Sequence, residues 1–435
     1  MMKIFEGKVG AQEFLAELEH RAGDADFAVE RTVRSIINDV KQKGDEAVKD
    51  YTARLDSDAV QYYRVPEVEI ISTFRNYEEN ERDLMGALKR CHANITAFHE
   101  VQKREGFTLA EKNGVITGQR IRPLETVGLY VPGGTAPLIS SVLMCAIPAK
   151  IAGVKRIVMC TPPRKDGTAN PDILAAAKLC GISEIYLCGG AQAIAAMAMG
   201  TAEIPKVDKI VGPGNVYVTM AKKLLFGAID IDMIAGPSEI LVIADKTANP
   251  AFIAADLLSQ AEHDMVASSV LVTDNREVAE KTVAEVEKQI ESLPRREIAK
   301  NSIRNFGAVI LVENMNEAVE IAEIIAPEHC EVIVENPLEW IGKIDNVGSL
   351  FLGAYTPEPL GDYFAGPNHV LPTNGTARFF SPLNVDSFTK KSSYIYYPKA
   401  ALEAAAQDTM LVARREDLVG HANSVKIRVG GYDDV

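Results

Sequence analysis

Apolar residues recur at intervals of three and four through much of residues 11–105, which is the spacing of an amphipathic helix. The stretches EFLAELEH and RTVRSIINDVKQKGDEAVKDYTARLD both follow this spacing. Residues 114–125, GVITGQRIRPLE, alternate instead, which is typical of a short strand or hairpin. We therefore expect a largely helical N-terminal region that ends at a strand near residue 114.

The pattern changes near residue 127, where short apolar runs that end in Gly or Pro begin to alternate with helical segments. The runs are VGLYVP (127–132), RIVMCTP (156–162), EIYLCGG (184–190) and KIVGPG (209–214). The helical segments are 137–154, 171–181, 191–200 and 215–227, and the first is apolar nearly all round, which predicts a buried helix. Repetition of strand, glycine turn and helix predicts a parallel α/β sheet.

A second series of the same kind follows, so we expect two α/β units in tandem. Its strands are EILVIAD (239–245), SSVLVTD (268–274), GAVILVE (307–313), CEVIVEN (330–336) and GSLFLG (348–353). Helices are expected near 250–263, 275–291 and 314–325. Residues 353–381 are rich in Pro and Gly and predict a long functional loop or linker. The last ~50 residues predict a small helical unit, with helices near 398–413 and 416–423.

Length, charge and cysteine content narrow the class of protein. A chain of 435 residues is expected to form two to three domains. The net charge of −14 argues against broad binding to nucleic acid or to anionic membranes. No apolar run reaches the ~18–20 residues of a membrane helix, and MMKIFEGKVG lacks the apolar core of a secretory signal. The six cysteines form no C-x-x-C pair, so we expect a reducing, cytoplasmic location.

Three glycine turns join predicted strands to predicted helices: VPGGTAP (131–137), CGGAQ (188–192) and VGPGN (211–215). Glycine permits close approach of a pyrophosphate, and a helix N-terminus offers free N–H groups to it. Pro137 suits a first helical turn and Asn215 suits an N-cap. The G-x-G-x-x-G fingerprint is absent, so the turns alone leave open whether they bind a nucleotide or are ordinary βα turns.

Two pairs of polar residues suggest chemistry. Gln260 and His263 are three positions apart at the end of a helical pattern, which puts them on one helix face. This spacing suits two metal ligands or a solvated helix end. Glu328 and His329 directly precede a predicted strand, where they could serve two proton-transfer roles or form only a turn.

Further candidates lie near the end of the chain. Asp362 and His369 are in the Gly/Pro-rich loop, and Glu416 and His421 are near the C-terminus. Four of the seven histidines, at positions 263, 329, 369 and 421, therefore fall in polar, glycine-punctuated segments. Each of these residues is weak evidence by itself.

Read in order, these segments closely resemble the histidinol dehydrogenase family over roughly residues 114–428. The matching stretches are VGLYVPGGTAPLISSVLMCAIPAKIAGV, GGAQAIAAMAMGT, DKIVGPGNVYVTMAKK, DMIAGPSEILVIAD, DLLSQAEHD, APEHCE, LGDYFAGPNHVLPTNGTARFFSPLNV and EDLVGHANSVKIR. The ordered set is far more specific than any one of its members. Where the family usually has two glycines, this chain has Asn374 and Gly375, and we expect Asn374 to tolerate positive φ.

The resemblance implies the roles of individual residues. One zinc ion would be held by Gln260, His263, Asp362 and His421. The substrate would be contacted by these ligands and by Ser238, His329, His369 and Glu416. NAD would be contacted by Tyr130, Gln192 and Asn215, which fall on the three glycine turns.

The resemblance also implies the reaction, which is the zinc-dependent oxidation of L-histidinol to L-histidine through L-histidinal with two NAD⁺. His329 would act as the base that removes the hydroxyl proton, so the rate should fall on acidification through its pKa. Glu328 would then activate the water that attacks the aldehyde. The metal would mainly orient the substrate.

The architecture implied is two incomplete Rossmann-like parallel-sheet domains in an α/β fold. We assign 1–25 to an N-terminal helical segment, 26–126 with 238–380 to a metal- and substrate-binding domain, 127–237 to an inserted NAD-binding domain, and 381–435 to a C-terminal segment. The C-terminal segment would reach into a second subunit of a homodimer, where His421 and Glu416 complete the partner's site.

Three alternatives can be tested against this hypothesis. A related zinc dehydrogenase could act on another small polar alcohol, such as a sulfonated diol. A cysteine-based aldehyde oxidation could use Cys145 or Cys188, but both lie in apolar runs, so we expect buried structural roles. A nucleotide-binding regulatory protein could have kept the fold and lost the chemistry.

Overall fold

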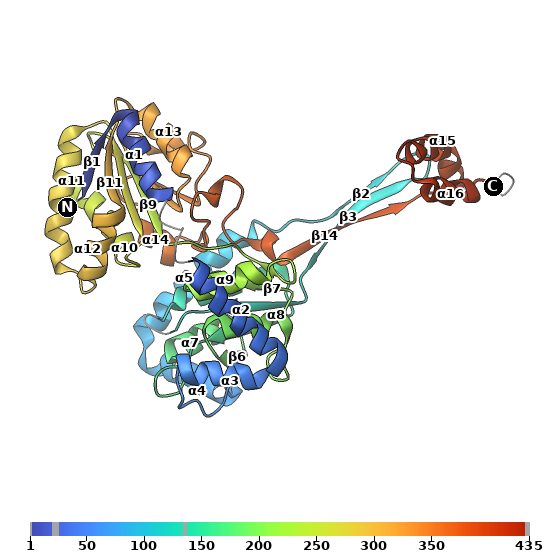
Figure 1. Cartoon of the computed structure of the whole chain (residues 1–435), viewed down its shortest axis with the longest axis horizontal. Coiled ribbons are helices and arrows are strands. Elements are labelled where there is room, and N and C mark those ends of the chain that lie inside the picture. Colours follow the sequence, from blue (N-terminus) through green and yellow to red (C-terminus); the bar gives the residue numbers. More distant parts are fainter. Residues whose placement is uncertain (1, 20–25, 134–136, 431–435) are drawn as a thin grey trace. The chain divides into compact units, whose positions relative to one another are not determined.

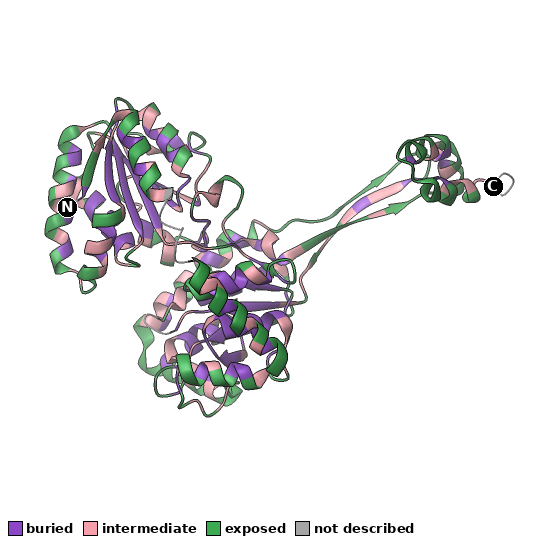
Figure 2. Ribbon diagram, viewed as in Figure 1, coloured by how far each residue is buried: buried purple, intermediate pink, exposed green. Residues whose placement is uncertain are grey.

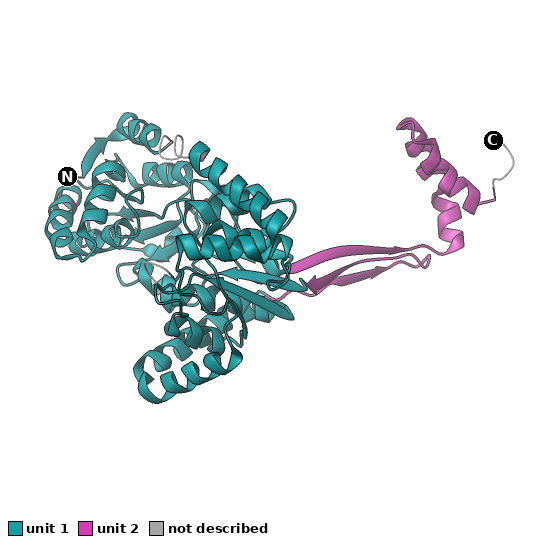
Figure 3. Ribbon diagram, turned by 60° about the horizontal axis from the view of Figure 1, so that its bottom comes forward, with its two compact units in different colours: residues 1–102, 124–388 teal, residues 103–123, 389–435 magenta. Residues whose placement is uncertain are grey.

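The computed structural model describes residues 2–19, 26–133 and 137–430. The chain divides into two compact units, which Figure 3 colours separately. Unit 1 comprises Met1–Gln102 and Leu124–Phe388, and unit 2 comprises Lys103–Pro123 and Thr389–Val435. Both α/β series belong to unit 1.

The second α/β series forms a six-stranded parallel sheet (Figure 1). The sheet has the order β1-β11-β10-β9-β12-β13. Its strands are β1 (Lys3–Glu6), β9 (Glu239–Ala244), β10 (Ser268–Thr273), β11 (Gly307–Leu311), β12 (His329–Ile333) and β13 (Ser349–Leu352). The five strands expected from the apolar runs are confirmed. Strand β1 was expected to be helical, and it forms at the sheet edge by pairing with β11 although it is mostly exposed.

Helices cover both faces of this sheet. On one face pack α10 (Pro250–Ala261), α11 (Arg276–Gln289) and α12 (Arg296–Phe306), and on the other pack α1 (Gly7–Glu19) and α13 (Met315–Ile325). Strand β9 alternates between the two layers, with Ile240 and Val242 in one core and Leu241 in the other. Helix α12 was not predicted, because only three of its 11 residues are buried and the rest read as a polar stretch.

The first α/β series forms a five-stranded parallel sheet with the order β6-β5-β4-β7-β8. Its strands are β4 (Thr126–Tyr130), β5 (Arg156–Thr161), β6 (Glu184–Leu187), β7 (Lys209–Val211) and β8 (Asp230–Ile231). The helices between them are α6 (Ile139–Ala152), α7 (Pro171–Leu179), α8 (Gly190–Met199) and α9 (Val216–Leu225). The predicted mixed α/β fold with two parallel sheets is confirmed.

The N-terminal helices also pack in the layers of the five-stranded sheet. Helices α2 (Asp26–Lys43) and α3 (Asp45–Leu55) contact α8, while α4 (Glu67–Asn80) contacts α7 and α5 (Arg82–Glu100) contacts α6. From the sequence, residues 26–126 were expected to belong with 238–380. Amphipathic periodicity shows that a helix has an apolar face but not which sheet covers that face.

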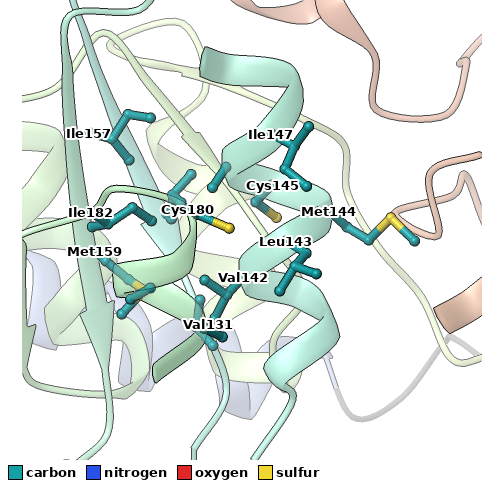
Figure 4. Close-up of a cluster of buried hydrophobic side chains, with 14 of the residues drawn as sticks. Val131, Val142, Leu143, Met144, Cys145, Ile147, Ile157, Met159, Cys180 and Ile182 are labelled. Atoms are coloured by element: carbon teal, nitrogen blue, oxygen red, sulfur yellow. The ribbon is translucent and has the colours of Figure 1, made fainter. Parts of the chain in front are cut away.

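Helix α6 occupies the centre of one of these layers. Ten of its 14 residues are buried, as its uniformly apolar sequence predicts. Figure 4 shows Val142, Cys145 and Ile147 of α6 facing apolar side chains of the adjoining strand and loop. Figure 2 shows that the buried residues of unit 1 concentrate in the two sheets and the inner helix faces.

Both sheets share one strand order. In each, the first strand of the series, β4 or β9, is central, the next two strands add on one side, and the fourth, β7 or β12, adds on the other. The order in which strands are added therefore reverses at the first strand, between it and the fourth, and ligands of open α/β sheets bind in the crevice at such a point. The two sheets therefore each offer one candidate crevice.

Unit 2 contains a three-stranded antiparallel sheet and two helices. The sheet consists of β2 (Phe107–Ala110), β3 (Ile116–Pro123) and β14 (Thr389–Tyr396), and the helices are α15 (Lys399–Arg415) and α16 (Val419–Arg428). The strand expected at 114–125 and two C-terminal helices are confirmed. Strand β14 was not predicted, because its residues are mostly exposed and show no alternation.

The Gly/Pro-rich segment is more ordered than its composition suggests, since it contains α14 (Glu358–Tyr363). Within the described residues, every helix is too short or too polar to cross a lipid bilayer.

Candidate functional site

The predicted catalytic pair lies at the amino end of the six-stranded sheet. Glu328 ends the loop that precedes β12, and His329 is the first residue of that strand. Glu239 begins the neighbouring strand β9, and the side chain of Glu328 accepts a hydrogen bond from the Glu239 N–H at 2.9 Å. Ligands of parallel sheets usually bind at the carboxyl ends. Here the polar residues gather at the opposite end.

His329 is 4% exposed, and backbone and carboxylate groups surround its ring. Its Nδ1 lies 3.0 Å from the Glu239 carbonyl oxygen and 3.6 Å from Glu328 Oε2. A carbonyl can only accept, so Nδ1 carries the proton of the neutral ring. Nε2 then has a free lone pair, and it has no hydrogen-bond partner among the described residues. This geometry suits a general base.

Two carboxylates face Nε2 of His329. Glu358 Oε1 and Asp362 Oδ1 each lie 3.8 Å from it. Burial alone lowers the pKa of His329, but Glu328, Asp362 and Glu358 outweigh burial and raise this pKa to about 10. Burial raises the pKa of Glu328 to about 8, against the opposing charge of His329. The two groups therefore titrate far from their ordinary ranges, as catalytic groups often do.

Asp362 lies in helix α14, rather than in a loop as expected. Burial alone raises its pKa, but the interactions with His329 and His369 outweigh burial and lower the pKa to about 2. His369 lies in the following loop, where its Nδ1 donates to the Asp362 carbonyl at 3.1 Å. Its Nε2 lies 3.5 Å from Ser141 Oγ of α6. Asp362 is therefore an ionised candidate ligand, and its backbone is hydrogen-bonded to His369 of the loop that follows α14.

Gln260 and His263 lie at the end of α10. Gln260 is buried in the last turn, whereas His263 is exposed in the turn that follows, with its N–H bonded to the Gln260 carbonyl. The expectation that both lie on one helix face is therefore wrong for His263, because the helix ends at Ala261. Gln260 lies near enough to Glu358 to lower the pKa of that carboxyl, and the charge of Asp362 raises the pKa of His263 against the effect of burial.

These side chains suit a divalent cation. His329, Glu358 and Asp362 place ligand atoms within 4.8 Å of one another, and Glu358 Oε1 and His329 Nε2 are buried without hydrogen-bond partners among the described residues. Imidazole nitrogen with carboxylate and amide oxygen is a donor set that Zn²⁺ and related metals accept. Glu358 was not predicted from the sequence. Its one signal was the four-residue spacing to Asp362, which was hidden in a segment read as a loop.

The three residues expected to contact NAD line one cavity of about 600 Å³ in unit 1, together with His263. Tyr130 ends β4 and its hydroxyl accepts the Gly190 N–H at 3.1 Å. Gln192 and Asn215 lie in or just before α8 and α9, which follow strands β6 and β7. This cavity is therefore at the carboxyl end of the five-stranded sheet, where the general rule expects it.

Local contacts prepare this cavity for a polar ligand. Asn215 accepts from the Tyr217 and Val218 N–H groups, which confirms the predicted N-cap. Gln192 donates to Asp56 Oδ2 at 3.3 Å, while its Oε1 is buried without a partner among the described residues. The volume lies in the usual range for small-molecule sites. Asp56 also lines the cavity and was not predicted, because it comes from the end of α3.

Other residues predicted from the sequence lie in other segments of the chain, or fall outside the residues that the structure describes. Residues 134–136 of the first glycine turn lie outside the described residues, and Pro137 precedes α6 by two positions. Ser238 directly precedes β9, and its carbonyl accepts the Ser268 N–H. Glu416 is the C-cap of α15 and His421 lies in α16, both in unit 2.

Two other expectations are confirmed. Cys145 and Cys188 are fully buried, and burial raises the pKa of the Cys145 thiol, which agrees with structural roles for both. Asn374 adopts a φ of 52° and is followed by Gly375 at 70°, so the turn tolerates asparagine in the left-handed region.

Comparison with known proteins gives one consistent result. The family model for histidinol dehydrogenase matches residues 19–429. The histidinol dehydrogenase of Clostridium acetobutylicum is 52% identical, and the match covers 98% of each chain. That of Listeria monocytogenes is 53% identical, over 98% of this chain and 99% of its own. The solved structure of the Elizabethkingia anophelis enzyme superposes with a TM-score of 0.91 at 39% identity, over 98% of each chain.

Proposed function

Because the chain belongs to the histidinol dehydrogenase family of NAD-dependent oxidoreductases, we propose that it oxidises L-histidinol to L-histidine through L-histidinal. In the first step the alcohol and one NAD⁺ give the aldehyde, NADH and a proton. In the second step the aldehyde, water and another NAD⁺ give the carboxylic acid, NADH and a proton. The proposal depends above all on His329, whose Nε2 is left free by the hydrogen bond of Nδ1 to Glu239.

His329 acts in the first step as the general base. The bond from Nδ1 to the Glu239 carbonyl fixes the tautomer and the ring orientation. The substrate hydroxyl gives its proton to Nε2 as the carbon loses hydride, for which NAD⁺ is the acceptor. Asp362 and Glu358 stabilise the imidazolium that results, since both carboxylates lie 3.8 Å from Nε2.

Glu328 acts in the second step. One of its carboxylate oxygens is held by the Glu239 N–H, so the group has a defined orientation next to His329. Its pKa of about 8 makes it a stronger base than an ordinary carboxylate, because burial disfavours the charged form. Glu328 removes a proton from the water molecule that attacks the aldehyde carbon.

One zinc ion would be held by Gln260, His263 and Asp362, with His421 from a second subunit. This metal would supply positive charge that orients the amino alcohol. Ser238, His369 and Glu416 would contact the substrate, while Tyr130, Gln192 and Asn215 would contact NAD. The support is the donor set around Asp362 and the Gln192 oxygen, which has no partner among the described residues and belongs to a residue that lines the cavity of about 600 Å³.

We further propose a homodimer in which each C-terminal segment completes the site of its partner. A reducing, cytoplasmic location also belongs to the proposal, and it is supported by the absence of disulfides among the six cysteines, all of which are described. A sulfonated diol as substrate is not favoured, since curated relatives over nearly the whole chain are named histidinol dehydrogenases.

The deciding experiment measures NADH formed per L-histidinol consumed by the purified protein. We expect two NADH per substrate, loss of turnover on treatment with a chelator, and recovery on addition of zinc. Both steps use one site, so the aldehyde should not accumulate.

Other outcomes contradict parts of the scheme. One NADH per substrate would show that the reaction stops at the aldehyde and would remove the role of Glu328. If zinc-loaded protein forms no NADH from histidinol but oxidises an anionic diol, the diol and not histidinol is the substrate. Full activity after removal of all metal would exclude the zinc ion.

A further inference from the structure

Three carboxyl groups lie together at the metal-ligand cluster, and one of them, Glu358, belongs to it. We call Asp256, Glu331 and Glu358 the carboxyl triad. Asp256 is on α10, four residues before Gln260, and Glu331 is on β12, two residues after His329. Glu358 begins α14, four residues before Asp362. Each member therefore shares a helix face or a strand face with one residue of the site.

The members of the triad contact one another. Glu331 Oε1 accepts the Glu358 backbone N–H at 2.7 Å, and the carboxyl groups of Asp256 and Glu331 are close enough to perturb each other's ionisation. Glu358 Oε2 accepts the Ser259 hydroxyl of α10 at 3.1 Å. Strand β12 and helices α10 and α14 are thus connected to one another through these groups.

Glu331 acts as a cap for α14 from another part of the chain. The Glu358 N–H belongs to the first turn of α14, where no carbonyl of the helix can accept it. The residue before it, Pro357, makes no side-chain cap. The Glu331 carboxyl takes that place and sets where α14 begins. Asp362 follows one turn later, so its position depends on this contact.

Glu331 Oε2 is buried and has no hydrogen-bond partner among the described residues, and the carboxyl group of Asp256 is its neighbour. Two ionised carboxylates cannot hydrogen-bond, so a proton on one of the two groups would join them. Burial raises the pKa of Asp256 to about 6 and raises that of Glu331 well above its ordinary value. A protonated carboxyl is close in shape and hydrogen bonding to an amide side chain, which allows a conservative replacement.

A carboxyl group at this position has a cost that an apolar residue would avoid. Cys330, Val332 and Ile333 on the same strand are buried and apolar. Glu331 is equally buried, at 1% exposed, although its side chain is polar. Burying polar groups is unfavourable unless each is paired, and apolar replacements often stabilise. The pairing of Glu331 with both α10 and α14 indicates a positional role.

We propose that Glu331, together with Asp256, is a positioning residue that fixes Gln260 and Asp362 relative to His329 and thereby sets the affinity of the site for a divalent metal. This inference rests on the proposed metal-dependent function. It assigns neither residue as a ligand or as a group that touches the substrate.

The test measures binding of Co²⁺ to metal-free full-length protein by visible absorption, together with the thermal midpoint. Loss of such supporting contacts typically lowers metal affinity 10- to 100-fold, and we expect about this for Glu331→Ala. Glu331→Gln keeps an oxygen for the Glu358 N–H and an NH₂ group for Asp256. It should retain wild-type absorption and affinity within about threefold.

The matched control is Val332→Ala, which removes a buried side chain from the next position of the same strand. It should lower the thermal midpoint and leave Co²⁺ affinity unchanged. If Glu331→Ala does not fold, Asp256→Ala replaces it, since Asp256 is only partly buried. A lowered Co²⁺ affinity of Asp256→Ala supports the proposal, and an unchanged affinity overturns it.

Three results would overturn the inference. Folded Glu331→Ala with wild-type Co²⁺ affinity overturns it alone and leaves the metal-dependent function intact. If Glu331→Gln binds Co²⁺ as weakly as Glu331→Ala does, the hydrogen bonds of the side chain do not set the metal affinity. Wild-type protein that binds no Co²⁺ overturns both this inference and the metal in the proposed function.

Discussion

His329 shows how neighbouring groups determine what a side chain can do. The Glu239 carbonyl selects the tautomer, and the carboxylates of Glu328, Glu358 and Asp362 determine the charge. The residue was identifiable in the sequence from the Glu-His pair before a strand and from the family resemblance. Its carboxylate neighbour Glu358 was not, because that residue is 29 positions away and reaches His329 only in the folded chain.

We expect the activity to depend on the ionisation of His329. His329 must be neutral to act as a base. We therefore expect kcat/KM for histidinol to be highest above the pKa of His329 and to fall as the pH is lowered through that pKa. The carboxylates raise this pKa from 6.5 to about 10. A cation beside Asp362 would cancel part of the negative charge of the carboxylates. In zinc-loaded protein, the pH at which kcat/KM falls to half should therefore lie between these two values.

A pH–rate profile of kcat/KM checks this prediction. Samples held at each pH and returned to the optimum before assay control for unfolding. A rate that is constant from about pH 6 to about pH 10 would rule out a histidine base.

At the scale of elements, a buried ion pair supports the turn that precedes α9. Lys222 of α9 pairs with Asp232 after β8, and the two side chains are 3% and 1% exposed. Lys222 donates to the Gly212 carbonyl at 3.0 Å, while Asp232 accepts the Gly212 N–H at 2.8 Å. Gly212 has a φ of 118°, which favours glycine. The pair therefore fixes the turn that leads to Asn215.

Lys222→Met should destabilise the fold by about 3–5 kcal/mol, because Asp232 is left buried without its partner. Urea unfolding measures this change. The variant should also raise the KM for NAD more than it lowers kcat, since the turn beside the cavity loses the hydrogen bond from Lys222 to the Gly212 carbonyl, and Asp232, which accepts the Gly212 N–H, loses its cationic partner. Lys223→Met, at the exposed neighbouring position, is the matched control and should change neither value. Equal stability of the two variants would contradict the prediction.

Elements also show where local patterns suffice. The short apolar runs predicted most strands of both sheets, because each run is largely buried on two faces. Strands β1 and β8 contain no such run, since β1 (KIFE) is mostly exposed and β8 (DI) has only two residues. They form because an adjacent strand offers unpaired backbone groups, which is information from the tertiary structure.

At the scale of the whole molecule, the proposed homodimer can be tested by complementation. His421→Ala and Glu328→Gln should each be inactive alone. A mixed dimer would contain one site with both defects and one site with neither, if His421 completes the partner's site. Random reassociation of equal amounts should then restore about a quarter of wild-type activity.

The measurement is NADH production after the two variants are dissociated together and refolded. Each variant treated in the same way by itself is the control. No recovery from the mixture, with dimers formed, would mean that His421 serves its own chain or no site.

The sequence by itself determined the fold class, the family and most of the candidate residues, because buried strands, glycine turns and ordered motifs are properties of contiguous stretches. Tertiary structure alone decided which groups meet. It brought Glu358 and Glu239 to His329, and Asp56 to Gln192. It also joined helices α2–α5 to the five-stranded sheet. These contacts join residues far apart in the chain, and their strength depends on burial and exact distance, which no local pattern encodes.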